Sequence, residues 1–187
     1  MRTALAILLV TALSTTARAG ELDLNFGLQA THTQWDDDHG GGPTLSAAWF
    51  VIPEVGISFI GKEHYSTIDQ RYMSYFSLNA VFARRWDRVR LSGTVGGVHQ
   101  HEETQDVIME QPIASAFGVA DGIRHRMAGR AGAQLAFTLS HLPTGDFYVA
   151  LDLDATVFAE ETRGPRWMNS AGLSLGFTHD FASAKTK

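Results

Sequence analysis

The stretch that most constrains this chain lies near its end, between Trp167 and Phe181. From Ala171, every second residue in it is apolar until His179 interrupts the pattern, the apolar positions being Ala171, Leu173, Leu175 and Phe177. The residues between them are small or weakly polar. A period of two indicates a β-strand with two unlike faces. We expect it to close a membrane-spanning β-barrel, with the small residues facing a crowded interior.

The same alternation recurs along the chain and predicts an all-β fold, an antiparallel up-and-down transmembrane β-barrel of about eight strands. It is clearest from Glu21, where Leu22, Leu24 and Phe26 share one face. The expected strands cover residues 21–33, 43–52, 55–61, 72–84, 89–98, 124–139, 147–160 and 167–181. An even strand count is typical of bacterial single-chain barrels.

The connections between these strands alternate in length. Short turns are expected near Pro53, Trp86 and Pro143, and longer loops at residues 35–42, 62–70, 99–123 and 161–165. Outer-membrane barrels show this asymmetry, with short periplasmic turns and long extracellular loops. The sequence leaves open whether 99–123 adds a hairpin.

The first nineteen residues have the features of a secretory signal peptide. A basic start precedes an apolar run from Ala4 to Leu13, and Ala17-Arg18-Ala19 is a small-residue cleavage site. The run is too short for a spanning helix, which needs about 20 residues. We therefore expect a cleaved signal at 1–19 and the barrel at 20–187.

Charge and cysteine content narrow the classes of function. The formal net charge is −5, and removing Arg2 and Arg18 with the signal makes it −7. An acidic exported chain is not expected to bind nucleic acid. The chain has no cysteine, so disulfide bonds cannot stabilise it.

Alternation alone does not decide whether the apolar face points to lipid or inward, as in a soluble periplasmic barrel that carries a ligand. Lysine is scarce, occurring only at Lys62, Lys185 and Lys187. The four tryptophans fall at strand ends, where membrane interfaces favour them, at positions Trp35, Trp49, Trp86 and Trp167. These features favour lipid.

The signal, the alternating strands and a closing strand that ends in Gly176-Phe177 and Phe181 resemble the small outer-membrane β-barrel superfamily of the OmpA membrane domain and OmpX. The resemblance implies location in the bacterial outer membrane and contact with its lipid and lipopolysaccharide. It also implies recognition of the terminal aromatic residue by the barrel-assembly machinery. Here residues 182–187 follow Phe181 as a tail. We expect a monomer.

Polar residues on the strand faces with small side chains are expected to point into the interior of the barrel. An ion-pair network is expected among Asn25, Gln29, Arg126, Arg130, Asp152 and Asp154. A narrow barrel has just enough interior for side chains to fill it. A filled, non-conducting interior is therefore expected, and the alternative is a small pore.

Two clusters are candidates for chemistry, although no cofactor is expected. His99 and His101 point the same way on an extended segment and, with Glu102, form a candidate metal site. The first loop, at 36–39, could add ligands. The alternative is a solvated polar loop.

His64-Tyr65-Ser66 is similar to the His-x-Ser element of the lipid A 3-O-deacylase family, in which serine attacks an ester with histidine as base. Thr67 stands where that family has Asn. We expect a structural, adhesion or surface-binding role through the loops, especially 99–123. A lipid A-modifying deacylase or acyltransferase is the alternative.

Overall fold

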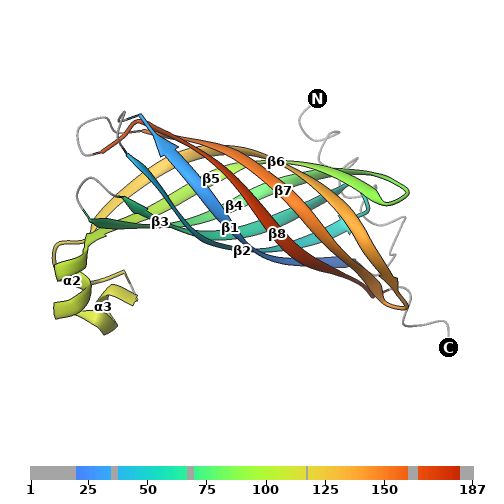
Figure 1. Ribbon diagram of the computed structural model, residues 1–187, viewed down its shortest axis with the longest axis horizontal. Helices are drawn as coiled ribbons and strands as arrows, with labels where there is room; N and C mark the ends of the chain where they lie inside the picture. Colours follow the sequence, from blue (N-terminus) through green and yellow to red (C-terminus); the bar gives the residue numbers. More distant parts are fainter. Residues whose placement is uncertain (1–19, 35–37, 67–69, 117, 160–163, 182–187) are drawn as a thin grey trace, which may run out of the picture.

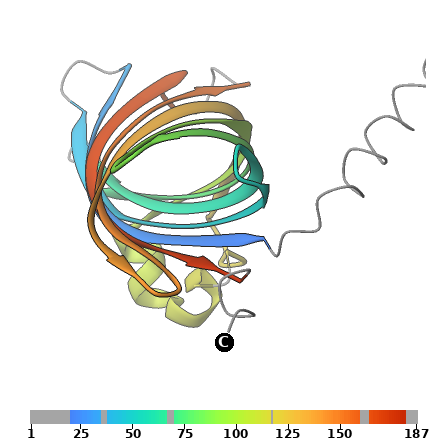
Figure 2. The same cartoon turned by 90° about the vertical axis from the view of Figure 1, so that its right-hand side faces the viewer.

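The computed structural model describes residues 20–34, 38–66, 70–116, 118–159 and 164–181. Within them, eight strands form one closed antiparallel barrel, in which each strand pairs with its sequence neighbours and the last pairs with the first (Figures 1 and 2). The strands are β1 (Glu21–Thr33), β2 (His39–Ile52), β3 (Val55–Ser66), β4 (Arg71–Trp86), β5 (Val89–Thr104), β6 (Arg124–Leu142), β7 (Gly145–Phe158) and β8 (Trp167–Asp180). The predicted fold class and strand number are confirmed.

Apolar side chains cover the outside of the barrel. Exposed fractions are 45% for Leu24, 46% for Phe137, 44% for Leu151 and 54% for Leu175. The alternate residues on the same strands are buried or half-buried and point inward. The predicted orientation of the two faces is therefore confirmed.

Three expected loops are wrong at their edges, because the strands extend further than predicted. Gly40–Gly42 belong to β2, 62–66 to β3 and 99–104 to β5. The polar residues there suggested loops, yet pairing with neighbouring strands continues through them, as in Gly40↔Ser66. In a barrel, polarity does not end a strand, because inward positions and positions beyond the apolar band are both polar.

Two short helices, α2 (Gln105–Glu110) and α3 (Pro112–Ala116), occupy the described part of the connection between β5 and β6. The Thr104 hydroxyl accepts a hydrogen bond from the Val107 amide at 3.4 Å and caps α2. Pro112 begins α3, at the helical position where proline is best tolerated. The connection therefore holds helices rather than an additional hairpin. No helix of the described residues is long and apolar enough to cross a bilayer.

The two ends of the barrel differ. At one end, here called the turn end, β1 begins, β8 ends, and the reversals at Pro53, Asp87 and Pro143 are short. The other end, the loop end, carries α2 and α3 (Figure 1).

Aromatic residues mark both ends of the barrel. Trp49 and Trp86 are exposed at the turn end, with the Trp49 ring 5.4 Å from the ring of Phe181, one residue past β8. Trp167 begins β8 at the loop end. The predictions for Trp35, for the signal peptide at 1–19 and for the tail at 182–187 concern residues outside the described ranges.

Candidate functional site

The middle of the barrel contains a carboxylate between two cations. Lys62 points inward from β3 and is 4% exposed. Its Nζ lies 2.7 Å from Asp154 Oδ1 and donates to Ser170 Oγ at 3.0 Å. Arg130 Nη2 lies 3.5 Å from Asp154 Oδ2. The pairing of Arg130 with a β7 carboxylate was predicted, whereas Lys62 was expected beside a loop.

Two further members of the expected interior network, Asp152 and Arg126, lie at different positions along the barrel. Asp152 accepts hydrogen bonds from Gln134 Nε2 at 2.9 Å and Ser174 Oγ at 2.5 Å. Arg126 lies two inward-facing positions from Arg130 toward the loop end of β6. It was expected to pair with the aspartates, but it does not. It donates to the Pro165 carbonyl at 2.6 Å, and its guanidinium carbon lies 3.9 Å from the centroid of the Phe158 ring.

A second charged layer closes the turn end, and the sequence reading missed its central residue, Arg90. Arg90 forms an ion pair with Asp23 and lies over the Tyr148 ring, 4.8 Å from its centroid. Tyr148 donates to Asp23 at 2.5 Å, and Asn25 Nδ2 lies 3.5 Å from the Tyr148 oxygen. Arg90 is 6% exposed, so this pair is shielded from bulk water.

A cavity of about 70 Å³ lies between these layers, lined by both of them and by Gln29. At roughly 10–15 Å³ for each water, it has room for about five. Toward the loop end, an apolar layer closes it, formed by Met73, Tyr75, Phe158 and Met168, each at most 3% exposed. A separate cavity of about 20 Å³ lies at the turn end beside Tyr148. The described interior is thus divided by side chains.

His64 and Ser66, the candidate hydrolytic pair, lie inside the barrel and are fully buried. Both are near Asp38: Ser66 Oγ donates to its Oδ1 at 2.7 Å, and His64 Nε2 lies 3.8 Å from the same oxygen. Neither ring nitrogen of His64 has a hydrogen-bond partner. The serine proton is therefore directed to a carboxylate and not to the histidine that would act as its base.

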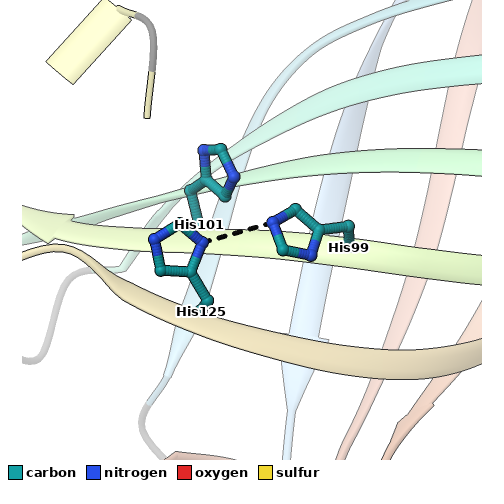
Figure 3. Close-up of side chains that lie close together, drawn as sticks. All are labelled: His99, His101 and His125. Atoms are coloured by element: carbon teal, nitrogen blue, oxygen red, sulfur yellow. Dashed lines mark hydrogen bonds between the residues drawn. The ribbon is translucent and has the colours of Figure 1, made fainter. Parts of the chain in front are cut away.

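The three imidazoles of His99, His101 and His125 meet on the outer face of the barrel (Figure 3). Their ligand nitrogens all lie within 4.8 Å of one another. His125, which no sequence signal singled out, lies directly across from His101 on β6. Glu102, the third residue of the expected set, points inward, is 1% exposed and forms an ion pair with Arg71. Of the loop residues 36–39, Asp36 and Asp37 lie outside the described residues, and His39 contacts His32.

The α2–α3 connection exposes apolar side chains at the loop end. Met109 is 74% exposed, Ile113 76% and Val119 72%. Residues 105–123 include Asp106, Glu110 and Asp121 but no lysine or arginine. The connection is therefore both apolar and acidic.

No family model matches the chain, and no curated protein sequence matches it significantly. Solved structures with the same fold are small outer-membrane barrels. Neisserial surface protein A superposes with a TM-score of 0.58 at 9% identity, over 87% of this chain and 97% of that protein. Ail, the attachment invasion locus protein of Yersinia pestis, solved with the heparin analogue sucrose octasulfate, gives 0.54 at 18% identity, over 86% and 99%.

The N-terminal β-barrel domain of OprF from Pseudomonas aeruginosa also gives 0.54, at 19% identity, over 86% of this chain and 98% of that one. At these identities the likeness establishes the fold alone. The chain has the fold of these proteins, a closed barrel of eight antiparallel strands, as the sequence pattern predicted.

Proposed function

We propose that this protein is a non-conducting outer-membrane barrel that binds a partner protein at the cell surface through its α2–α3 connection. The observation that carries the proposal is the distribution of polarity: apolar side chains outside, charged ones inside. An apolar belt around a closed sheet is stable against acyl chains and would aggregate in water. In this proposal, residues 1–19 are removed as a signal peptide and the assembly machinery inserts a monomer that contacts lipopolysaccharide.

The division of the interior supports a role without conduction. The apolar layer at Tyr75 and the ion pair of Arg90 with Asp23 lie on opposite sides of the central cavity. An ion that passed through the barrel would have to displace both the apolar layer and this ion pair. Because the interior is filled, we place function on the loops, which a rigid barrel positions.

The α2–α3 connection favours a protein partner with a basic and apolar surface. Its exposed Met109, Ile113 and Val119 supply apolar area, and its charged residues are all acidic. Ail was solved with a sulfated heparin analogue. A polyanion of that kind would be repelled by this connection, so we expect protein rather than sulfated glycan to bind here.

The test uses the full mature chain in phospholipid vesicles, applied to an array of purified extracellular proteins and heparin. We expect binding to basic proteins and none to heparin. The double variant Met109→Ser/Ile113→Ser should lose the binding, whereas Glu54→Gln at the turn end should keep it. Binding to heparin alone, or binding that survives replacement of 105–123 by a two-residue turn, would overturn the proposal.

A further inference from the structure

The outer histidine cluster is fixed by the register of β4, β5 and β6. His101 pairs with Ser74 on one side and His125 on the other, and His99 pairs with Met127. His99 and His101 share a face because they are two residues apart on one strand. Strand pairing, rather than a mobile loop, thus brings the three imidazoles together.

The distances match those of a transition-metal site before ligation. His99 Nε2 and His125 Nδ1 are 3.2 Å apart. Zinc binds imidazole nitrogen at about 2.0–2.1 Å in tetrahedral geometry, which places two ligand atoms roughly 3.4 Å apart. The ring of His101 is centred 4.7 Å from each of the other two rings. A rotation of its side chain closes the triangle.

Groups around the cluster suit a cation. Glu103 lies two residues beyond His101 on β5, is 8% exposed, and its Oε2 has no hydrogen-bond partner. A buried carboxylate oxygen without a partner is unfavourable unless a donor or cation satisfies it. The Met127 sulfur lies 3.3 Å from His99 Nδ1, the ring nitrogen that does not face His125, and so leaves His99 Nε2 to bind the ion.

The cluster also lies where an aqueous ion can reach it. His99 shares a row with Phe76 and Met127, the last exposed apolar residues of their strands toward the loop end. The next row contains Ser74, His101 and His125. The site is therefore at the border between the apolar belt and the loop end, with His125 exposed.

We propose that His99, His101 and His125 form a binding site for one divalent transition-metal ion of the zinc class on the outer rim of the barrel. Three neutral imidazoles are a common ligand set for zinc and leave one position open. Hard cations such as Ca²⁺ and Mg²⁺ prefer oxygen ligands and are excluded by this set. The site is independent of the proposed partner binding and does not require it.

The connection beyond α3 lies against the site. A methyl group at Gly118 would overlap the His101 ring, so the chain there contacts the imidazole directly. An ion bound by His101 would therefore restrict the movement of this ring and of the segment that covers it.

The test is a calorimetric titration of the full mature chain, folded in detergent micelles, with ZnCl₂. We expect one equivalent bound in the micromolar range or tighter, unaffected by excess Ca²⁺ or Mg²⁺. His125→Gln should weaken zinc binding at least about tenfold. Removing a residue that only hydrogen-bonds a metal ligand already costs about 10–100-fold in affinity, and His125 is itself a ligand here. The variant His99→Gln/His125→Gln should abolish it.

The chain provides its own control in His32 and His39, a second cross-strand pair whose Nδ1 atoms are 3.1 Å apart at the loop end. His32→Gln/His39→Gln should bind zinc like the parent chain. As a second readout, Co²⁺ should give the visible absorption of a four-coordinate site in the parent and not in the double variant. Absence of zinc binding by the parent would refute the site. Equal binding by the His99/His125 double variant would also refute it, provided that an unheated sample of the variant migrates on a gel as a folded barrel.

Discussion

At the scale of single residues, a glycine on one strand leaves room for an aromatic ring from the next strand inside the barrel. Tyr148 points inward from β7 and lies across Gly176 on β8, with which it is paired. The Tyr148 ring occupies the space that a side chain at Gly176 would need. The slim face of the closing strand thus accommodates a ring whose hydroxyl holds Asp23.

Gly176→Ala should therefore destabilise the barrel. The added methyl overlaps a buried ring, and overpacking of this kind costs about 1–3 kcal/mol. Gly97→Ala is the matched control, because a methyl there meets nothing within 4 Å. We expect its free energy of unfolding to stay within about 0.5 kcal/mol of the parent. Urea unfolding in vesicles measures both, and equal stabilities would contradict the fit.

A second residue-scale prediction concerns the carboxylate between two cations. Asp154→Asn leaves Lys62 and Arg130 facing each other without a counter-charge, and breaking a buried pair in this way costs about 3–5 kcal/mol. Lys62→Met leaves Asp154 with Arg130, 3.5 Å away, and should cost less, about 1–3 kcal/mol. Urea titrations of the two variants measure the loss of unfolding free energy in each and show which loss is larger. A larger loss for Lys62→Met would show that Arg130 does not neutralise Asp154.

At the scale of the strand, the sequence predicts which residues share a face, but not where the strands end or how neighbouring strands are aligned. Alternation predicted that residues such as Leu24 and Leu175 lie on the apolar face, because a period of two places alternate residues on opposite faces, and the scarce lysines and the tryptophans at strand ends indicated that this face points to lipid. It failed at Lys62, since a polar residue in a barrel strand can equally face the interior. It also missed His125, because a cross-strand neighbour depends on register, which a single strand does not encode.

The lipid-facing role of these strands predicts a dependence on position. Leu78 is 67% exposed in the middle of the belt on β4, and Val55 is 38% exposed at the turn end of β3. Leu78→Arg should lower stability by about 2–4 kcal/mol, and Val55→Arg by about 0–1, since the cost of arginine falls from the bilayer centre to its interface. Refolding into phospholipid vesicles at increasing urea measures the difference. If the two variants are equally stable, the belt does not face lipid.

At the scale of the whole molecule, two layers of side chains cross the interior of the barrel at different positions along its axis. The apolar layer around Tyr75 lies on the loop side of the central cavity, and the layer of Arg90, Asp23 and Tyr148 on the turn side. Among the residues that the structure describes, Tyr75 and Tyr148 are the two largest fully buried side chains. Closures in series mean that opening one of them leaves the path blocked by the other.

This arrangement predicts how conduction depends on the two rings together. The parent chain should be silent in planar bilayers, and so should Tyr75→Ala and Tyr148→Ala, because each single variant keeps one layer intact. Tyr75→Ala/Tyr148→Ala should pass small ions, since it also removes the ring on which Arg90 lies and the hydroxyl that holds Asp23, so that the central cavity of about 70 Å³ would connect to both ends. Gly97→Ala, on the outer face, serves as the control for preparation and insertion. Conductance by the parent would mean that the two layers together do not seal the interior, and conductance by either single variant would mean that one layer alone does not. A silent double variant would locate the seal in the charged groups that line the cavity.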